Sequence, residues 1–122
     1  MKILVVDDDA DIRRIVCVSL SRLGGMEVIE ASSGADGVRK AEEECPDAIL
    51  LDVMMPSMDG PATLAALRST PATAGIPVVF LTATVLESEV ARFKAMGAVD
   101  VLTKPFDPAS LVAEVGRMLH RG

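Results

Sequence analysis

Apolar residues in this chain gather in five short segments that are rich in β-branched side chains, and longer stretches with a helical spacing separate them. Strands buried on both faces of a parallel sheet have this composition, and amphipathic helices have this spacing. The pattern predicts strands over residues 2–6, 26–31, 47–51, 76–81 and 98–102. A helix is expected after each strand, which gives five strand–helix units.

Capping residues and helix breakers mark the predicted helices. In the first helix, five apolar residues at three- and four-residue steps are expected to face the core: Ile12, Ile15, Val16, Leu20 and Leu23. Ser33 can cap the second helix, and Asp59 followed by Pro61 opens the third. The fourth helix carries Leu86 and Phe93 on its apolar face. Each helix therefore offers one apolar stripe to a shared core.

The strict alternation of strands and helices predicts one α/β domain over residues 1–122. Short connections and right-handed crossovers would place helices on both faces of a central five-stranded parallel sheet. Five units are too few for an eight-stranded barrel. We therefore expect an open, doubly wound sandwich without a linker or a low-complexity segment.

Composition narrows the possible partners. The chain has 12 Lys and Arg against 18 Asp and Glu, a net charge of −6 at pH 7. Nucleic-acid backbones are bound by basic surfaces, so direct contact with nucleic acid is not expected. No apolar run approaches the ~20 residues of a membrane span, and no secretory signal precedes the first strand. We expect a cytoplasmic protein that makes no membrane contact, with Cys17 and Cys45 as reduced, packed thiols.

Polar residues stand just past four of the predicted strands. Asp7 and Asp8 follow the first strand, Asp52 the third, Thr82 the fourth and Lys104 the fifth. Ligands of open α/β sheets bind beyond the carboxyl ends of the strands. If the first, third and fourth strands are neighbours, three carboxylates meet at one place, with a hydroxyl and an ammonium group beside them.

Three carboxylates this close need a counter-charge. Two unit charges about 4 Å apart repel by roughly 4 kcal/mol at an effective dielectric constant of 20. Protons or a cation must relieve the repulsion, and Mg²⁺ is the typical hard cation where phosphate chemistry occurs. These segments contain no His or Cys, which argues against zinc and copper.

The lysine and the threonine suit a phosphoryl group, which brings nearly two negative charges and several acceptor oxygens. Lys104 supplies a cation and Thr82 a hydrogen-bond donor. Asp52, the central carboxylate, can attack phosphorus and form an aspartyl phosphate. A bound metal would shield its charge from the incoming phosphoryl oxygens.

Five segments, each weakly diagnostic alone, occur in order along nearly the whole chain. They are Ile3-Leu4-Val5-Val6-Asp7-Asp8, Leu51-Asp52-Val53-Met54-Met55-Pro56, Met58-Asp59-Gly60, Leu81-Thr82-Ala83 and Lys104-Pro105-Phe106. Together they resemble the receiver domain of the two-component response-regulator family. The resemblance implies a flavodoxin-like (βα)5 fold with the strand order 2-1-3-4-5.

The resemblance also assigns roles to the acidic residues. It implies that Asp52 is the phosphoacceptor and that Asp8 is a direct metal ligand. Asp7 would hold a metal-bound water molecule, and the backbone carbonyl of Met54 would be a further protein ligand. The implied cofactor is Mg²⁺.

The remaining roles concern the phosphoryl group. Family likeness implies that Thr82 and Lys104 contact its oxygens and that the small Ala83 leaves room for them. It also implies a cis peptide bond between Lys104 and Pro105, a state that is rare outside X–Pro bonds.

The function implied by the resemblance is bacterial signalling, not turnover of a metabolite. The chain would take a phosphoryl group from a phosphohistidine on a sensor histidine kinase or a histidine phosphotransfer protein. Phosphorylation would then alter the surface of the fourth helix, fifth strand and fifth helix. A downstream protein or a fused output domain would read that change.

Two departures from the family pattern keep alternatives open. Val101 stands where many relatives carry the Tyr or Phe of the conformational switch, and Met54 is apolar where many are polar. One alternative is therefore a receiver-fold adaptor that is never phosphorylated. Another is a Mg²⁺-dependent phosphatase with an aspartyl nucleophile in Asp7-x-Asp9, although Asp11 stands where Thr or Val is expected.

The acidic residues also have a purely structural interpretation. Carboxylates after a strand are often helix caps, and Asp9 is expected to be one. Asp11 and Asp59 favour the positive ends of helix dipoles. The combination of Asp7, Asp8 and Asp52 with Lys104 favours a functional site over capping alone.

Overall fold

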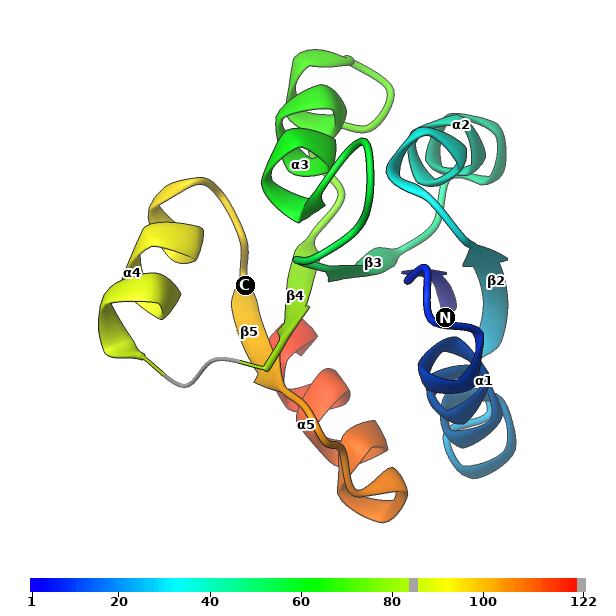
Figure 1. The fold of residues 1–122 in the computed structure, drawn as a ribbon. Helices are drawn as coiled ribbons and strands as arrows, with labels where there is room; N and C mark the ends of the chain where they lie inside the picture. Colours follow the sequence, from blue (N-terminus) through cyan, green and yellow to red (C-terminus); the bar gives the residue numbers. More distant parts are fainter. Residues whose placement is uncertain (84–85, 121–122) are drawn as a thin grey trace.

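In the computed structural model of the chain, which describes residues 1–83 and 86–120, five strands form one sheet in the order β2-β1-β3-β4-β5 (Figure 1). The strands are β1 (Lys2–Val6), β2 (Glu27–Ala31), β3 (Ala48–Asp52), β4 (Val78–Thr82) and β5 (Asp100–Thr103). All neighbouring strands pair in parallel. The predicted flavodoxin-like (βα)5 fold and its strand order are confirmed.

Helices cover both faces of this sheet. They are α1 (Ala10–Val18), continued by a π-helical turn η1 (Ser19–Leu23), α2 (Gly34–Glu44), α3 (Gly60–Ser69), α4 (Glu87–Ala95) and α5 (Pro108–His120). Figure 1 shows α1 and α5 on one face and α2, α3 and α4 on the other. This is the doubly wound arrangement that the alternation of strands and helices predicted.

The sheet separates two hydrophobic cores because successive strand residues point to opposite faces. Leu4 and Val6 of β1 belong to the core under α2, α3 and α4, which also contains Phe80 and Phe93. Ile3 and Val5 belong to the core under α1 and α5. The same alternation holds in β3, all of which is buried. The buried central strands therefore provide a firm support for the residues that follow their carboxyl ends.

Strand register brings the polar positions together. Val6 of β1 pairs with Leu51 of β3, so the residue after each, Asp7 and Asp52, lies at the same edge of the sheet. The ladder continues past β1, because the Asp7 N–H donates to the Ala31 carbonyl at 3.1 Å. The convergence of these two strand ends follows from this pairing.

Three strands, β3, β4 and β5, end one residue later than predicted. Asp52 is the last residue of β3 and Thr82 the last of β4, not residues just beyond them. Ladder bonds hold both ends: the Val53 N–H donates to the Leu81 carbonyl at 3.0 Å, and the Lys104 N–H to the Thr82 carbonyl at 2.8 Å. Both side chains are buried.

Three apolar residues that the sequence pattern predicted to face the core are exposed instead. Ile15 is 43% exposed, Leu23 63% and Leu86 62%. The π-helical turn changes the angular step after Val18, so Leu20 is buried while Leu23 turns outwards. Leu86 is the N-cap residue of α4 and lies before its apolar face.

The cysteines behave differently from each other. Both are free thiols, as predicted, but only Cys17 is buried; Cys45 is exposed, so the prediction that it is packed is wrong. Cys45 ends α2 in a left-handed conformation, with φ of 48°, which directs it away from the core. Among the residues that the structure describes, no helix has the length and apolar character that a membrane crossing requires.

Candidate functional site

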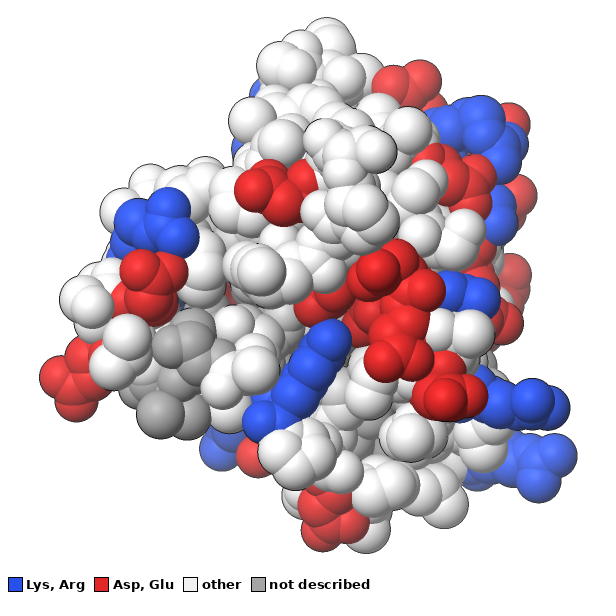
Figure 2. Space-filling view, viewed as in Figure 1, with Lys and Arg blue, Asp and Glu red and all other residues white. Residues whose placement is uncertain are grey.

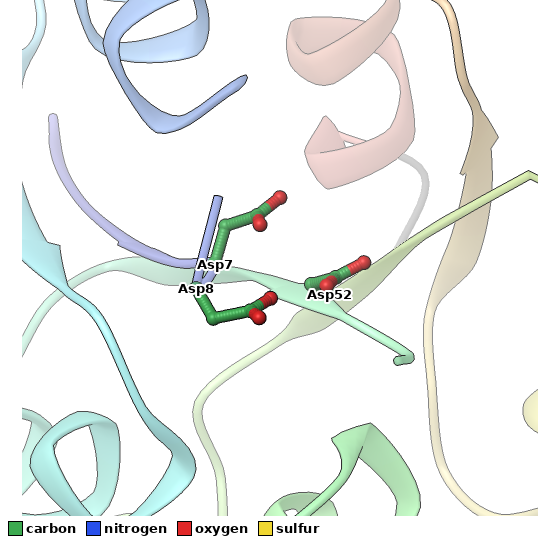
Figure 3. A group of neighbouring side chains, drawn as sticks. All are labelled: Asp7, Asp8 and Asp52. Carbon is green, nitrogen blue, oxygen red and sulfur yellow. The ribbon is translucent and has the colours of Figure 1, made fainter. Parts of the chain in front are cut away.

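Three carboxylates meet at the carboxyl edge of β1 and β3. Asp7, Asp8 and Asp52 each present one oxygen atom, and these atoms all lie within 4.8 Å of one another (Figure 3). Asp7 and Asp52 are buried, and Asp8 is exposed. In Figure 2 acidic side chains crowd this edge of the molecule, with a basic side chain beside them. The predicted convergence of the three carboxylates is therefore observed.

The ammonium group of Lys104 lies against this cluster. Its Nζ donates to Oδ1 of Asp52 at 2.9 Å and to Oδ2 of Asp7 at 3.2 Å. The lysine follows β5 and precedes the cis peptide bond to Pro105, as the resemblance implied. One cation is thus shared by two buried carboxylates, while the third member, Asp8, is left to solvent.

The charges of the cluster perturb one another. Burial raises the pKa of Asp52; the hydrogen bond from Lys104 opposes this, and the negative charges of Asp7 and Asp8 add to it, so the pKa stays above its ordinary value. Burial lowers the pKa of Lys104, but Asp52 and Asp7 outweigh it and the net pKa is raised. A site with three carboxylates and one ammonium group thus favours the binding of further positive charge.

Asp9 has a purely local role. Its Oδ1 accepts hydrogen bonds from the N–H groups of Asp11 at 2.9 Å and Ile12 at 3.3 Å, which makes it the N-cap of α1. Its own N–H donates to Oδ1 of Asp7 at 2.9 Å. The prediction that Asp9 is a cap is confirmed, and the cap helps to orient the buried Asp7.

Thr82 lies in the strand next to Asp52. Asp52 pairs with Leu81, so Thr82 is one residue beyond that pair at the same sheet edge. Thr82 and Ala83 line a groove of about 380 Å³ together with Met54 and Leu86. The strand register thus places Thr82 at the same sheet edge as Asp52, and its contact with a phosphoryl oxygen stays a prediction.

Met54 follows Asp52 on the loop to α3, and its side chain is 79% exposed. The neighbouring Val53 carbonyl accepts the Gly60 N–H at 2.9 Å. Among the described residues, no backbone N–H donates to the carbonyl of Met54. The role of this carbonyl as a metal ligand stays a prediction.

Val101, which replaces the switch aromatic, is half-buried and packs against the core under α2, α3 and α4. It pairs with Phe80 of β4, whose ring meets that of Phe93 edge-on at 4.9 Å between centroids. The strand partner of Val101 is therefore part of an aromatic pair that is buried in the core.

Two residues to which the sequence pattern assigned no role at the site support the cluster. Arg13 donates from Nη1 to the backbone carbonyl of Asp7 at 2.8 Å. Gly60 approaches the backbone so closely that a β-carbon there would lie 2.7 Å from the carbonyl oxygen of Asp52. The position of Gly60, directly after the capping Asp59 of the third predicted helix, could have indicated its role. Nothing in the local pattern distinguished Arg13 from Arg14.

The donor set fits a hard divalent cation. All three acidic ligands are carboxylates, and no nitrogen or sulfur donor accompanies them in the described group. Oxygen-only sites with two or more carboxylates suit Mg²⁺. The arrangement can thus hold a cation beside a buried carboxylate that an ammonium group also contacts.

Comparison with known protein families gives a consistent result. The profile described as "Response regulator receiver domain" matches residues 3–116. The chain is 40% identical over 120 residues to the phosphate regulon transcriptional regulatory protein PhoB of Escherichia coli, covering 98% of this chain and 52% of that protein. It is 44% identical over 121 residues to the transcriptional regulatory protein PrrA of Mycobacterium tuberculosis, covering 98% and 50%. The chain thus spans about half the length of the curated relatives it matches.

Solved structures resemble the fold over nearly all of its length. The chemotaxis response regulator CheY4 of Vibrio cholerae superposes with a TM-score of 0.89 and 34% identity, covering 96% of this chain and 97% of that one. The receiver domain of the Francisella response regulator 1452 gives a TM-score of 0.86 at 29% identity, covering 98% and 97%.

Proposed function

The chain belongs to the response regulator receiver domain family, and from that premise we propose that residues 1–122 form a phosphoacceptor module in which Asp52 takes up the phosphoryl group. The observation that carries the proposal is the buried Asp52 carboxylate, grouped with Asp7 and Asp8 and contacted by Lys104 at 2.9 Å. Under this proposal Asp52 is the nucleophile, the carboxylate cluster is the cation site, and Lys104 is the counter-charge for the phosphoryl oxygens.

The proposed reaction is a direct phosphoryl transfer. A carboxylate oxygen of Asp52 forms a bond to phosphorus while the bond from phosphorus to the imidazole nitrogen of a phosphohistidine breaks. The electron pair of the broken bond stays on the imidazole, and the product is an acyl phosphate. The three carboxylates, with the Met54 carbonyl, would hold Mg²⁺, which when bound neutralises charge on the phosphoryl oxygens.

Lys104 and Thr82 would bind the product. The ammonium group of Lys104 already lies beside the attacking carboxylate, so a small rotation would bring it to a phosphoryl oxygen. Thr82 would donate its hydroxyl proton from the neighbouring strand. Together they supply positive charge and a hydrogen bond where the transferred group brings negative charge.

The proposed partners follow from the chemistry and the relatives. The donor would be a sensor histidine kinase or a histidine phosphotransfer protein in the cytoplasm. The curated relatives are transcriptional regulators of about twice this length. We therefore propose that a downstream protein or a fused output domain reads phosphorylation through the α4–β5–α5 surface. The chain modifies itself and does not turn over a metabolite.

The decisive experiment supplies a small phosphodonor. The wild type and Asp52→Asn are incubated with acetyl phosphate and Mg²⁺, and intact mass is measured. We expect one phosphoryl group on the wild type and none on the variant. Beryllofluoride with Mg²⁺ should likewise shift backbone amide resonances around Thr82 only in the wild type. An unmodified wild type, or a variant modified at the same site, would rule the proposal out.

The replacement of the switch aromatic by Val101 supports one alternative, an adaptor whose binding ignores phosphorylation. Equal partner binding by the wild type and Asp52→Ala would favour it. The phosphatase alternative is disfavoured, because the carboxylate of Asp9, the second acid of its motif, is engaged as the N-cap of α1.

A further inference from the structure

A single guanidinium group joins three elements behind the carboxylate cluster. Arg13 of α1 donates from Nη1 to the backbone carbonyl of Asp7 at 2.8 Å, and from Nε to Oε1 of Glu30 in β2 at 2.9 Å. Its side chain is 19% exposed, and that of Glu30 is 53% exposed. We refer to Arg13 and Glu30, with their contact to Asp7, as the arginine brace.

We propose that Arg13 is a positioning residue for the Mg²⁺ site, because it holds the peptide between Asp7 and Asp8 and thereby sets where the Asp8 carboxylate lies. The inference rests on the proposed function, since it concerns the cation that phosphoryl transfer would use.

The carboxylates differ in how they are held. Asp7 accepts hydrogen bonds from the Asp9 N–H and from Lys104, and Asp52 accepts one from Lys104. Asp8 is exposed, and among the described residues nothing donates a hydrogen bond to its carboxylate. The position of Asp8 therefore depends on its backbone.

That backbone is fixed by the brace. The carbonyl of Asp7 and the N–H of Asp8 share one planar peptide unit, so a hydrogen bond to the carbonyl restricts rotation of the whole plane. On the other side of the residue, the Asp7 N–H donates to the Ala31 carbonyl at 3.1 Å. Asp7 is thus tied to β2 twice, once directly and once through Arg13 and Glu30.

The brace contributes geometry more than energy. An ion pair with a half-exposed partner such as Glu30 is worth little by itself. A planar guanidinium, however, presents its donors in a rigid fork and holds two acceptors at set angles, whereas the donors of a lysine rotate freely about a single nitrogen atom.

Charge and geometry predict opposite outcomes for the loss of Arg13. Removing a positive charge near an acidic cluster makes the local potential more negative and should tighten binding of a cation. Removing the brace frees the peptide that carries Asp8 and should therefore weaken binding of the cation. Arg14 provides the matched control: it is the next residue in α1, it is exposed, and among the described residues it forms no hydrogen bond with Asp7.

The test measures the Mg²⁺ dissociation constant of the unphosphorylated chain by isothermal titration calorimetry. We expect Arg13→Ala to weaken binding about tenfold, the lower end of the range for outer-shell partners of metal ligands. Arg13→Lys keeps the charge but should lose several-fold in affinity, because a single Nζ atom lacks the rigid fork by which the guanidinium spans the Asp7 carbonyl and Glu30. Arg14→Ala should leave the constant unchanged or slightly lower.

The possible results separate this inference from the proposed function. Binding by Arg13→Ala that matches or exceeds the wild type would overturn the positioning role while leaving phosphoacceptance intact. If that variant does not fold, as judged by circular dichroism, Arg13→Lys decides, and unchanged affinity overturns the role. A wild type that binds no Mg²⁺ would overturn both this inference and the metal-assisted function.

Discussion

The Nζ atom of Lys104 lies 2.9 Å from Oδ1 of Asp52, although 52 residues separate them in the chain. The same nitrogen lies 3.2 Å from Oδ2 of Asp7. One ammonium group thus compensates two buried carboxylates, and Asp8 adds a third negative charge nearby. The three carboxylates therefore repel one another, and a bound cation or a neutralising substitution can relieve this repulsion.

Asp52→Asn should stabilise the chain at neutral pH in the absence of divalent cations. Burial and neighbouring acids raise the pKa of Asp52 in the folded state, so the folded state holds this proton more tightly than the unfolded state. Wild-type stability therefore falls as pH rises through the window between the unfolded pKa and the raised folded pKa. The variant lacks this loss, so its free energy of unfolding at pH 7 should exceed that of the wild type by up to about 2 kcal/mol. This estimate takes a repulsion of roughly 4 kcal/mol between two neighbouring carboxylates, which Lys104 partly offsets.

Urea unfolding of both proteins from pH 3 to pH 8 measures this effect. The two stability curves should converge at acid pH, where Asp52 is protonated in the wild type. An advantage of the variant that is the same at every pH would contradict the electrostatic explanation.

Lys104→Ala should destabilise the chain by about 2 kcal/mol, because it leaves two buried carboxylates without their cation. This is below the usual cost of breaking a fully buried pair, since the Lys104 side chain is 20% exposed. Lys94→Ala is the control: its pair with Asp100 is longer, at 3.6 Å, and the Lys94 side chain is 46% exposed, so the pair should contribute at most about 0.5 kcal/mol. Chemical denaturation without Mg²⁺ gives both values, and similar losses for the two variants would contradict the prediction.

Mg²⁺ should stabilise the wild type through Asp8 and not through Asp9. At a concentration 100 times the dissociation constant, a ligand of the folded state adds about 2.7 kcal/mol. Asp8→Ala should lose this gain with little change in basal stability. Asp9→Ala should keep the gain but cost about 1 kcal/mol, because it removes the N-cap of α1. Thermal unfolding with and without Mg²⁺ distinguishes them, and a gain retained by Asp8→Ala would count against the metal assignment.

Gly60→Ala should displace the backbone next to Asp52 and so disturb the site. A β-carbon at Gly60 would lie 2.7 Å from the Asp52 carbonyl oxygen and 2.8 Å from the Cα atom of Val53, so the loop or α3 must shift. We expect a loss of about 2 kcal/mol, within the usual range for overpacking, and slower labelling by acetyl phosphate. Gly116→Ala in α5, where nothing lies within 4 Å, should instead stabilise by about 0.5–1 kcal/mol. If acetyl phosphate labelled Gly60→Ala as fast as the wild type, the close approach of Gly60 to Asp52 would be dispensable.

The two thiols should react at very different rates. Burial, aided by the negative charge of Glu30, raises the pKa of Cys17 to about 12, whereas Cys45 is exposed. Iodoacetamide at pH 8 should therefore add one group to the native chain, on Cys45, and two groups in guanidinium chloride. Peptide mass spectrometry locates the adducts. Equal native labelling of both residues would mean that the α1 face opens readily.

Local pattern predicted much of this molecule because its signals are local. Alternation of apolar runs and helical stripes marked every strand to within two residues, since burial on both faces of a sheet leaves a continuous apolar run. Polar residues at the strand ends identified Asp7, Asp8, Asp52 and Lys104. Their convergence depended on the strand order, which the family resemblance supplied and the structure confirmed.

The tertiary structure alone decided which way individual side chains turn. The π-helical turn at the end of α1 exposes Leu23, and the capping geometry of α4 exposes Leu86. The reach of Arg13 to the Asp7 carbonyl likewise depends on how α1 packs against the sheet. The sequence determined the fold and the chemical groups of the site, because hydrophobic period and strand-end residues are properties of neighbouring positions. Helix rotation and contacts between distant elements are set by packing of the whole domain, and no local pattern encodes them.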